Sequence, residues 1–522
     1  MNINFQGESK PLNHIWSACV GAGRANEGLR ADWQNHLFKA VKYGGFRYLR
    51  FHGLLHDDMH VYKIVDGQEV FNFQYVDALF DAMLDLGIRP FVEFGFMPND
   101  LASTERTQFW WKGNVSPPND YAKWAKLISK LVEHWTQRYG LEEVKNWYFE
   151  VWNEPNLSAF WDGTKEQYFR LYQVSVAAIK AIDDRLRVGG PATSNFVPDA
   201  RFDGELEDIS THLTLVTEDL DSLEWKGVWI EEFLAFCERK KLPIDFISTH
   251  PYPTDFALDG HGEFQGRSRH ASSTKDDIEW LKRVIASSAY PDVEIHLTEW
   301  SSSPSSRDCS HDYLPAAAYV VKTNLEVSDL IDSLSYWVFT DVFEEVGAGP
   351  AAFHGGFGML NLQGIPKPTF HAYSFLNQLG EHELARNEGT VITRTDKGEL
   401  RGLFYNYPED YKGTVPMSVY PDQTVAQTAQ SFGSSKTFNL VVEQVTPGGQ
   451  YVLRTVDRDH GVAVQLWNEM GSPNSPSREQ TEQLIAYANQ LNERKFTADS
   501  NGRLTLDFNI GPWAIALLSE EV

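Results

Sequence analysis

The chain has 522 residues, enough for two to four domains of ordinary size. Its 46 basic and 72 acidic side chains leave a net charge of −26, so nucleic acid and anionic membrane surfaces are unfavourable partners. Apolar residues make up 42% and charged residues 23%, as in globular proteins, which excludes a disordered or fibrous chain.

The N-terminal segment has no basic stretch followed by an apolar run, and no apolar run is long enough to cross a membrane. We therefore expect a cytoplasmic protein, although a secreted or periplasmic form whose signal had been removed would look the same. Cys19, Cys237 and Cys309 are too few and too scattered for a disulfide framework or a zinc site, so we expect free thiols.

From residue 14 to residue 341, short apolar segments alternate with amphipathic ones. Apolar residues at three-to-four spacing predict helices that include 119–138, 164–182, 227–239, 274–287 and 312–329. The apolar segments predict eight strands, at 14–20, 46–53, 89–96, 147–154, 187–193, 243–252, 294–300 and 333–341. Eight β/α units in order favour a closed (β/α)8 TIM barrel over a doubly wound sheet. Gly21 and Gly23 are interpreted as the tight turn after the first strand.

After residue 375 the pattern changes to short strands separated by turn signals. We expect a catalytic barrel at 13–375 and an antiparallel β-sandwich accessory domain at 376–522, joined by a strand from 1–12. The segments 451–467, 502–509 and 512–519 read as strands, and 478–493 reads as a helix that interrupts the sandwich. The long acidic segment 194–226 is expected to form a loop.

Two carboxylates fall at the ends of predicted barrel strands, where barrel proteins carry their functional groups. Glu154 ends the fourth strand and Glu299 lies on the seventh, each close to a Trp. The two strands lie across the barrel mouth from one another, so the pair could straddle a glycosidic bond, with one group donating a proton and the other attacking or activating water. The alternative is that each is a solvated strand end or an ion-pair partner. Glu150, on the same strand face as Glu154, is interpreted as a hydrogen-bonded carboxylate of the barrel interior.

The motifs around these glutamates resemble those of glycoside hydrolase family 39, which contains β-xylosidases and α-L-iduronidases. The resembling stretches are FHGLLHDDM (51–59), FEVWNEPNLSAFW (149–161), FISTHPYP (246–253), HLTEW (296–300), YWVFTDVFEE (336–345) and FHGGFG (353–358). They span nearly the whole predicted barrel. The family pairs a barrel with a β-sandwich, which agrees with the expected architecture.

The resemblance implies that Glu154 is the general acid/base and Glu299 the nucleophile. It implies that Asn153 holds the sugar 2-hydroxyl and that Tyr252 hydrogen-bonds the nucleophile. The further positions that it places around the non-reducing-end sugar are His52, His250, Trp337, Glu344, Glu345, Phe353 and His354. One departure is that Ser301-Ser302-Ser303-Pro304 follows the nucleophile motif, where many relatives have Asn-Thr-Ser-Tyr.

The resulting hypothesis is a retaining exo-β-1,4-xylosidase that acts on xylo-oligosaccharides and needs no cofactor and no metal. Another specificity on the same machinery, α-L-arabinosidase or α-L-iduronidase, is the main alternative. An iduronidase would need cationic groups for the sugar carboxylate, whereas the matched positions include Glu344 and Glu345. A non-catalytic carbohydrate-binding barrel is the alternative from another class. The sequence does not indicate an oligomeric state.

Overall fold

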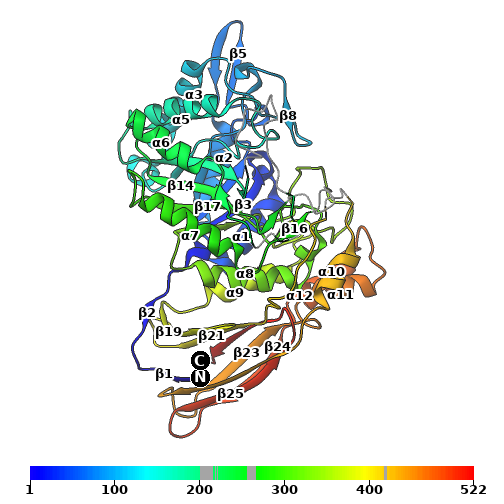
Figure 1. Cartoon of the computed structure of the whole chain (residues 1–522). Coiled ribbons are helices and arrows are strands. Elements are labelled where there is room, and N and C mark those ends of the chain that lie inside the picture. Colours follow the sequence, from blue (N-terminus) through cyan, green and yellow to red (C-terminus); the bar gives the residue numbers. More distant parts are fainter. Residues whose placement is uncertain (200–215, 218, 220–221, 256–265, 417–419, 522) are drawn as a thin grey trace.

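Eight parallel strands close into a barrel in the computed structural model, which describes residues 1–199, 216–217, 219, 222–255, 266–416 and 420–521 (Figure 1). The last strand pairs back onto the first through Tyr336 and Val20. The strands are β3 (Cys19–Arg24), β4 (Tyr48–His52), β7 (Arg89–Glu93), β10 (Tyr148–Glu150), β11 (Arg187–Ser194), β14 (Phe246–His250), β17 (Glu294–Trp300) and β18 (Ser333–Tyr336). The predicted TIM barrel is confirmed.

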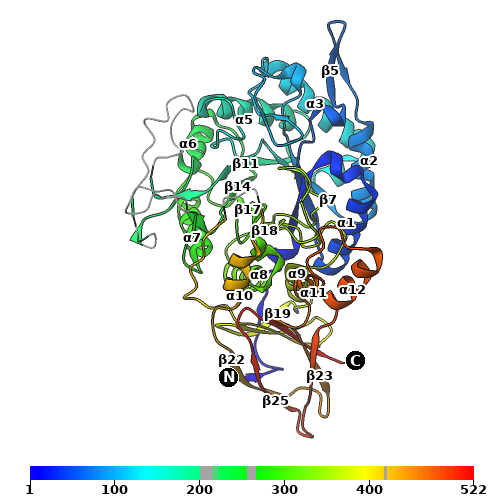
Figure 2. The same cartoon turned by 90° about the vertical axis from the view of Figure 1, so that its right-hand side faces the viewer.

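Amphipathic helices surround the strands, as Figure 2 shows. In α3, Trp124, Leu127, Leu131 and Trp135 are buried at helical spacing, and the Asp120 side chain caps the first turn. The helices that follow successive barrel strands are α1 (Ala31–Gly44), α2 (Gln74–Asp85), α3 (Tyr121–Tyr139), α5 (Lys165–Lys180), α6 (Ile230–Lys240), α7 (Ser273–Ala286), α8 (Leu314–Val327) and α9 (Pro368–Asn377), with the short α4 (Leu141–Val144) after α3.

The first barrel strand differs from its predicted position at 14–20. The apolar residues Ile15–Ser17 form a 3-10 helix, and the strand runs through the small residues that follow them. Gly21 and Gly23 therefore lie within the strand rather than in a turn. A side chain at Gly21 would come within 2.7 Å of the Trp337 ring, and one at Gly23 within 2.4 Å of the Glu27 carboxylate. Close packing thus requires glycines here, which weakens the apolar signal of a strand.

Two further sheets form the C-terminal part of the chain. A seven-stranded sheet has the order β2-β19-β20-β21-β26-β23-β24, and a three-stranded sheet has the order β1-β22-β25. Their strands are β1 (Asn2–Asn4), β2 (Lys10–Pro11), β19 (His382–Asn387), β20 (Thr390–Arg394), β21 (Leu400–Tyr405), β22 (Lys436–Glu443), β23 (Gln450–Val456), β24 (Asn492–Thr497), β25 (Arg503–Ile510) and β26 (Ile515–Glu520). The expected C-terminal antiparallel β-structure is confirmed, while the domain boundaries remain a prediction.

The seven-stranded sheet has apolar residues on both faces. Phe404 and Leu518 pack toward Phe508 of the three-stranded sheet, whereas Leu403 and Leu517 belong to the apolar core shared with the barrel. The alternation follows from the two-residue period of a strand. Helices α8 and α9 lie between barrel and sheet in Figure 1, so one continuous core joins the two parts.

The helices of the C-terminal part were predicted less well. Residues 463–467, read as part of a strand, belong to α11 (Ala463–Glu469). The strand β23 ends at Val456, and a turn over 457–460 followed by Gly461, with a positive φ of 80°, redirects the chain before the helix begins. The helix expected at 478–493 ends earlier, as α12 (Arg478–Ala488), since β24 pairs with β23 from residue 492 onward. The additional α10 (Gln423–Gln430) precedes β22.

Four two-stranded antiparallel sheets are found in the described parts of the connections between barrel elements. They are β5 (Tyr62–Val65) with β6 (Gln68–Phe71), β8 (Thr107–Gln108) with β9 (Gly113–Asn114), β12 (Phe196–Val197) with β13 (Lys226–Gly227), and β15 (Thr254–Asp255) with β16 (Arg267–Ser268). Most of the acidic segment 194–226 lies outside the described residues. Across the described ranges, no helix has both the length and the apolar character needed to span a bilayer.

The connection between β18 and α9 is fastened by a fully buried lysine. Lys367 Nζ lies 2.8 Å from an Asp312 oxygen and 2.6 Å from an Asp341 oxygen, and it donates to the Gly356 carbonyl at 2.8 Å. Asp341 also accepts a backbone hydrogen bond from Gly358 at 2.6 Å. The buried charges are thus paired on both sides, which holds the long connection against the barrel rim.

Lys367→Met should lower the free energy of unfolding by about 3–5 kcal/mol, because it leaves two buried carboxylates without their cation. The shift in the urea-denaturation midpoint measures this. Lys495→Met is the matched control, since Lys495 pairs with Glu521 while its side chain is 64% exposed, and its loss should cost less than about 1 kcal/mol. Equal shifts in the two variants would contradict the interpretation.

Candidate active site

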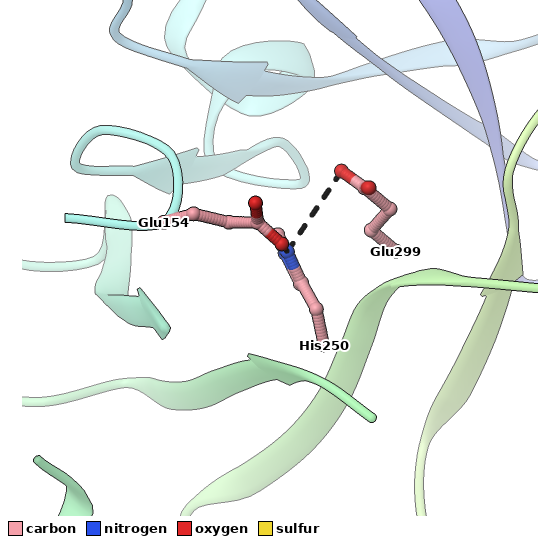
Figure 3. A group of neighbouring side chains, drawn as sticks. All are labelled: Glu154, His250 and Glu299. Carbon is pink, nitrogen blue, oxygen red and sulfur yellow. Dashed lines mark hydrogen bonds and ion pairs between the residues drawn. The ribbon is translucent and has the colours of Figure 1, made fainter. Parts of the chain in front are cut away.

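Glu154 and Glu299 meet at the carboxyl ends of the barrel strands, but the fourth strand ends at Glu150, so Glu154 lies in the loop that follows it rather than on the strand. One oxygen of each carboxylate and Nδ1 of His250 all lie within 4.8 Å of one another. Figure 3 shows His250 reaching between the two glutamates, from a strand different from either. The residues are almost fully buried, with 4% of Glu154 and 7% of Glu299 exposed. Two carboxyl groups therefore face each other in a site from which most water is excluded.

The loop that carries Glu154 is held in an unusual backbone conformation. Trp152 and Glu154 have positive φ angles of 73° and 45°. The Glu154 N–H donates to Ala192 of β11 at 2.8 Å, and the Asn156 side chain exchanges two 2.9 Å hydrogen bonds with the Ser194 backbone. Residues other than glycine rarely adopt a positive φ unless the surrounding structure enforces it, and such residues concentrate at functional sites.

Glu299 is positioned by donors on two sides. The Tyr252 hydroxyl donates to Oε1 at 2.7 Å, and Arg50 donates to Oε2 at 3.3 Å. His52 Nε2 lies 4.0 Å from Oε2. All of these donors favour a negatively charged carboxylate.

Arg50 is the centre of the buried network. Its guanidinium contacts Glu150 at 2.6 Å, Glu93 at 3.2 Å and Glu299 at 3.3 Å, and it donates to Asn153 Oδ1 at 2.8 Å. Burial alone would lower the pKa of Arg50, but the three carboxylates outweigh this effect and raise the pKa above its usual value. The guanidinium therefore stays charged. Sequence reasoning did not include Arg50 or Glu93 among the site residues. The available signal was a charged residue on the inward face of an otherwise apolar strand.

The two glutamates have different electrostatic environments. Burial raises the pKa of Glu154 to about 7, although the Ser194 hydroxyl and the positive charge of Arg50 oppose the shift. Burial also raises the pKa of Glu299, against the opposing effects of His250, His52 and Arg50. Glu154 is therefore suited to carry a proton near neutral pH, while Glu299 has the direct cationic partner.

His250 links the acid to the barrel interior. Its Nδ1 lies 2.9 Å from Glu154 Oε1, and its Nε2 lies 3.0 Å from the Thr298 hydroxyl. The same hydroxyl donates to Glu150 at 2.8 Å. Burial lowers the pKa of His250 to about 4, so the ring is neutral at pH 7.

An aromatic wall surrounds His52 beside the two glutamates. The ring centroid of His52 lies 4.8 Å from that of Trp337, 5.7 Å from that of Phe96 and 6.0 Å from that of Phe109. His52 Nδ1 is held by Glu93 at 2.6 Å. Such a wall offers flat apolar faces next to ionised and hydrogen-bonding groups.

The structure separates the remaining predicted residues. Burial, together with the negative charges of Glu299 and Glu154, raises the pKa of Glu345 well above its usual value. The Glu344 carboxylate instead binds Arg30 at 3.0 Å and Arg24 at 3.4 Å. Phe353 packs against Trp467 of α11, with the ring centroids 5.5 Å apart.

His354 lies on the same connection after β18. Its Nδ1 is 3.0 Å from the Ala351 carbonyl oxygen. Burial lowers the pKa of His354, and the negative charge of Asp341 opposes this shift. The predicted residues that directly contact Glu154, Glu299 or their immediate partners are thus His52, Asn153, His250, Tyr252 and Trp337.

The oxygens of Glu154 and Glu299 and the His250 nitrogen are also close enough to reach a common cation. Each of these atoms already has an internal partner, because Glu154 contacts His250 and Glu299 contacts Tyr252 and Arg50. The arrangement itself provides a proton donor and an anionic oxygen on either side of a narrow space.

Comparison of the chain with known proteins identifies its family. The family model for glycosyl hydrolases family 39 matches residues 1–215 and 218–505. A β-xylosidase of Geobacillus stearothermophilus is 38% identical over 509 residues, which cover 96% of this chain and 91% of that protein. A β-xylosidase of Caldicellulosiruptor saccharolyticus is 36% identical over 530 residues, which cover 99% of this chain and 98% of that protein.

A solved structure agrees over the full length. The crystal structure of a monomeric β-xylosidase from Caulobacter crescentus CB15 matches with a TM-score of 0.84 at 31% identity, covering 100% of this chain and 99% of that one. The match thus includes both the barrel and the C-terminal sheets. The chain belongs to glycosyl hydrolase family 39.

Proposed function

We propose that the protein is a retaining exo-β-1,4-xylosidase that releases xylose from the non-reducing ends of xylo-oligosaccharides. The observation that carries the mechanism is the oxygen-to-oxygen approach of Glu154 and Glu299 to within 4.8 Å. Retaining glycosidases keep their carboxyl groups about 5–5.5 Å apart, whereas inverting ones need about 6.5–9.5 Å for a water molecule. The two full-length relatives, both β-xylosidases, support a β-xyloside as the substrate.

Glu299 is the proposed nucleophile. Its ionised carboxylate attacks the anomeric carbon, the glycosidic C–O bond breaks, and the leaving oxygen takes the proton of Glu154. Ester formation removes the negative charge of Glu299, so Glu154, now ionised, can accept a proton from water. The water oxygen then displaces Glu299, and both carboxyl groups return to their initial states.

The hydrogen-bond chain through His250 supports Glu154 as the proton donor. The Thr298 hydroxyl donates its hydrogen bond to Glu150. In its contact with His250, the Thr298 oxygen must therefore accept a hydrogen bond from Nε2–H. A neutral imidazole that donates from Nε2 has only an acceptor at Nδ1. The proton in the 2.9 Å contact between Nδ1 and Glu154 therefore belongs to the carboxylic acid.

Several neighbours are suited to hold the sugar. Asn153 is fixed through its oxygen by Arg50, while its buried Nδ2 has no hydrogen-bond partner among the described residues, which leaves a donor for the sugar 2-hydroxyl. Glu345 can accept from sugar hydroxyls, and Trp337 can face the apolar side of the ring. Glu344 would act indirectly, through its arginine partners. Direct contacts by Phe353 and His354 remain predictions.

The charges favour a neutral sugar. Arg50 is already surrounded by three carboxylates, and Arg24 is paired with Asp58, Glu27 and Glu344. An iduronic acid carboxylate would therefore approach Glu299 beside two arginines whose charges are already offset by carboxylates. The α-L-arabinosidase alternative involves a neutral pentose and is tested by comparing aryl arabinosides with aryl xylosides.

Azide should rescue variants of the two glutamates with opposite stereochemistry. With an activated aryl β-xyloside, Glu154→Ala should accumulate the xylosyl-enzyme, which azide converts into β-xylosyl azide. Glu299→Ala should lose at least about 10⁴-fold in kcat, and azide should attack the substrate directly to give α-xylosyl azide. Product analysis by NMR distinguishes the two. Rescue of neither variant, or β-xylosyl azide from Glu299→Ala, would sink the assignment.

The pH profile should report the proton on Glu154. Because burial raises the pKa of Glu154 to about 7, kcat/KM should fall as the pH rises through about 7 and the acid loses its proton. Thr298→Val removes the acceptor for Nε2, so the ring can carry its proton on Nδ1 and donate to ionised Glu154. The basic limb should then move down by about 1 pH unit.

Thr298→Ser is the matched control, because it keeps the hydroxyl and should keep the basic limb in place. The measurement is kcat/KM for an aryl β-xyloside between pH 5 and about 9 in all three proteins. A Thr298→Val enzyme that loses activity with an unmoved basic limb would show that Thr298 supports only the packing of the site.

A further inference from the structure

Two large apolar side chains are exposed at the rim of the site. Trp110 is 64% exposed and Val346 is 53% exposed. Trp110 lies at the tip of the β8–β9 hairpin, and Val346 follows Glu345 on the connection after β18. The Trp110 N–H donates to the Glu345 carbonyl at 2.8 Å, and a methyl group placed on Gly347 would lie 3.9 Å from the Trp110 ring. The two loops therefore meet at this point.

The neighbours of Trp110 show that the hairpin borders the site. The Phe109 centroid lies 6.0 Å from that of His52 and 5.5 Å from that of Phe160, so Phe109 belongs to the wall beside Glu299. Trp111 is buried, and its ring lies 5.2 Å from the Arg24 guanidinium. Of three successive aromatic residues, two line the interior and only Trp110 is turned outward.

Backbone geometry enforces this outward direction. Phe109 and Lys112 both have positive φ angles, of 68° and 59°, on either side of the two tryptophans. Non-glycine residues avoid this region unless the surroundings hold them there. The indole of Trp110 is thus held in an exposed position, where it is not buried by other parts of the described chain.

We propose that Trp110, together with Val346, forms the platform for the sugar on the leaving-group side of the scissile bond. This inference rests on the proposed function. The Arg50 cluster fills the inner end of the site. Phe109 packs against Phe160, which lies in the loop that follows the proposed proton donor Glu154, so the hairpin borders the side on which the leaving oxygen takes its proton. Trp110 and Val346 are the exposed apolar side chains described at this border. The ligand class is a neutral pyranose, which can lay its C–H face on an indole.

The test compares a substrate that has a sugar leaving group with one that has none. The readout is the ratio of kcat/KM for xylobiose to kcat/KM for β-D-xylopyranosyl fluoride. Trp110→Ala should lower this ratio about tenfold, as loss of one aromatic contact predicts. Trp110→Phe keeps a flat ring and should retain most of the ratio. Phe38→Ala is the matched control, because Phe38 is a 52% exposed aromatic residue on helix α1.

An unchanged ratio in Trp110→Ala, in an enzyme that still hydrolyses both substrates, would overturn the platform and leave the proposed function standing. An equal loss on both substrates would likewise overturn it, since Trp110 would then support only the fold of the rim. Wild-type protein that hydrolyses neither xyloside would overturn the proposed function and this inference with it.

Discussion

The interior of the barrel mouth depends on the charge of Arg50. A guanidinium with no exposed side-chain surface contacts Glu93, Glu150 and Glu299, and it also fixes Asn153. A buried carboxylate without a cation or hydrogen-bond donors is strongly unfavourable, so removing Arg50 would leave three such groups competing for too few donors. The charge of Arg50 thus permits a cluster of acids at a place where water is largely excluded.

Glu150 connects the environments of the two glutamates. On one side it binds Arg50, which in turn reaches Glu299. On the other side it accepts the Thr298 hydroxyl, which determines the tautomer of His250 beside Glu154. One buried carboxylate therefore supports the ionised state of one glutamate and the protonated state of the other. Opposite protonation states are what acid and nucleophile roles require of two chemically identical side chains.

Much of this arrangement could be predicted from the sequence. The alternation of strands and helices indicated the barrel, and the ends of the fourth and seventh strands indicated Glu154 and Glu299. The glycine-rich first strand was misplaced, because close approach of the Trp337 ring and Glu27 selects small residues that lack an apolar pattern. The helix at 463–469 was missed because its apolar residues also fit a strand.

The partners of individual side chains could not be predicted, because they depend on which distant residues meet in space. Arg50 and Glu299 are 249 positions apart, and Glu344 meets Arg30 across 314 positions. The resemblance to family 39 motifs identified Glu344 as a position near the sugar, but it did not indicate that two arginines bind the Glu344 carboxylate. Such pairings follow from the register of the closed barrel rather than from any local pattern.

The central claim is that Glu154 and Glu299 act by double displacement at a β-xyloside. Proton NMR of an aryl β-D-xylopyranoside during hydrolysis tests it most directly, because the anomer of xylose formed before mutarotation reports the number of displacements. The account predicts that β-xylose appears first. Initial formation of α-xylose would mean a single inverting displacement and would contradict the assignment of Glu299 as the nucleophile.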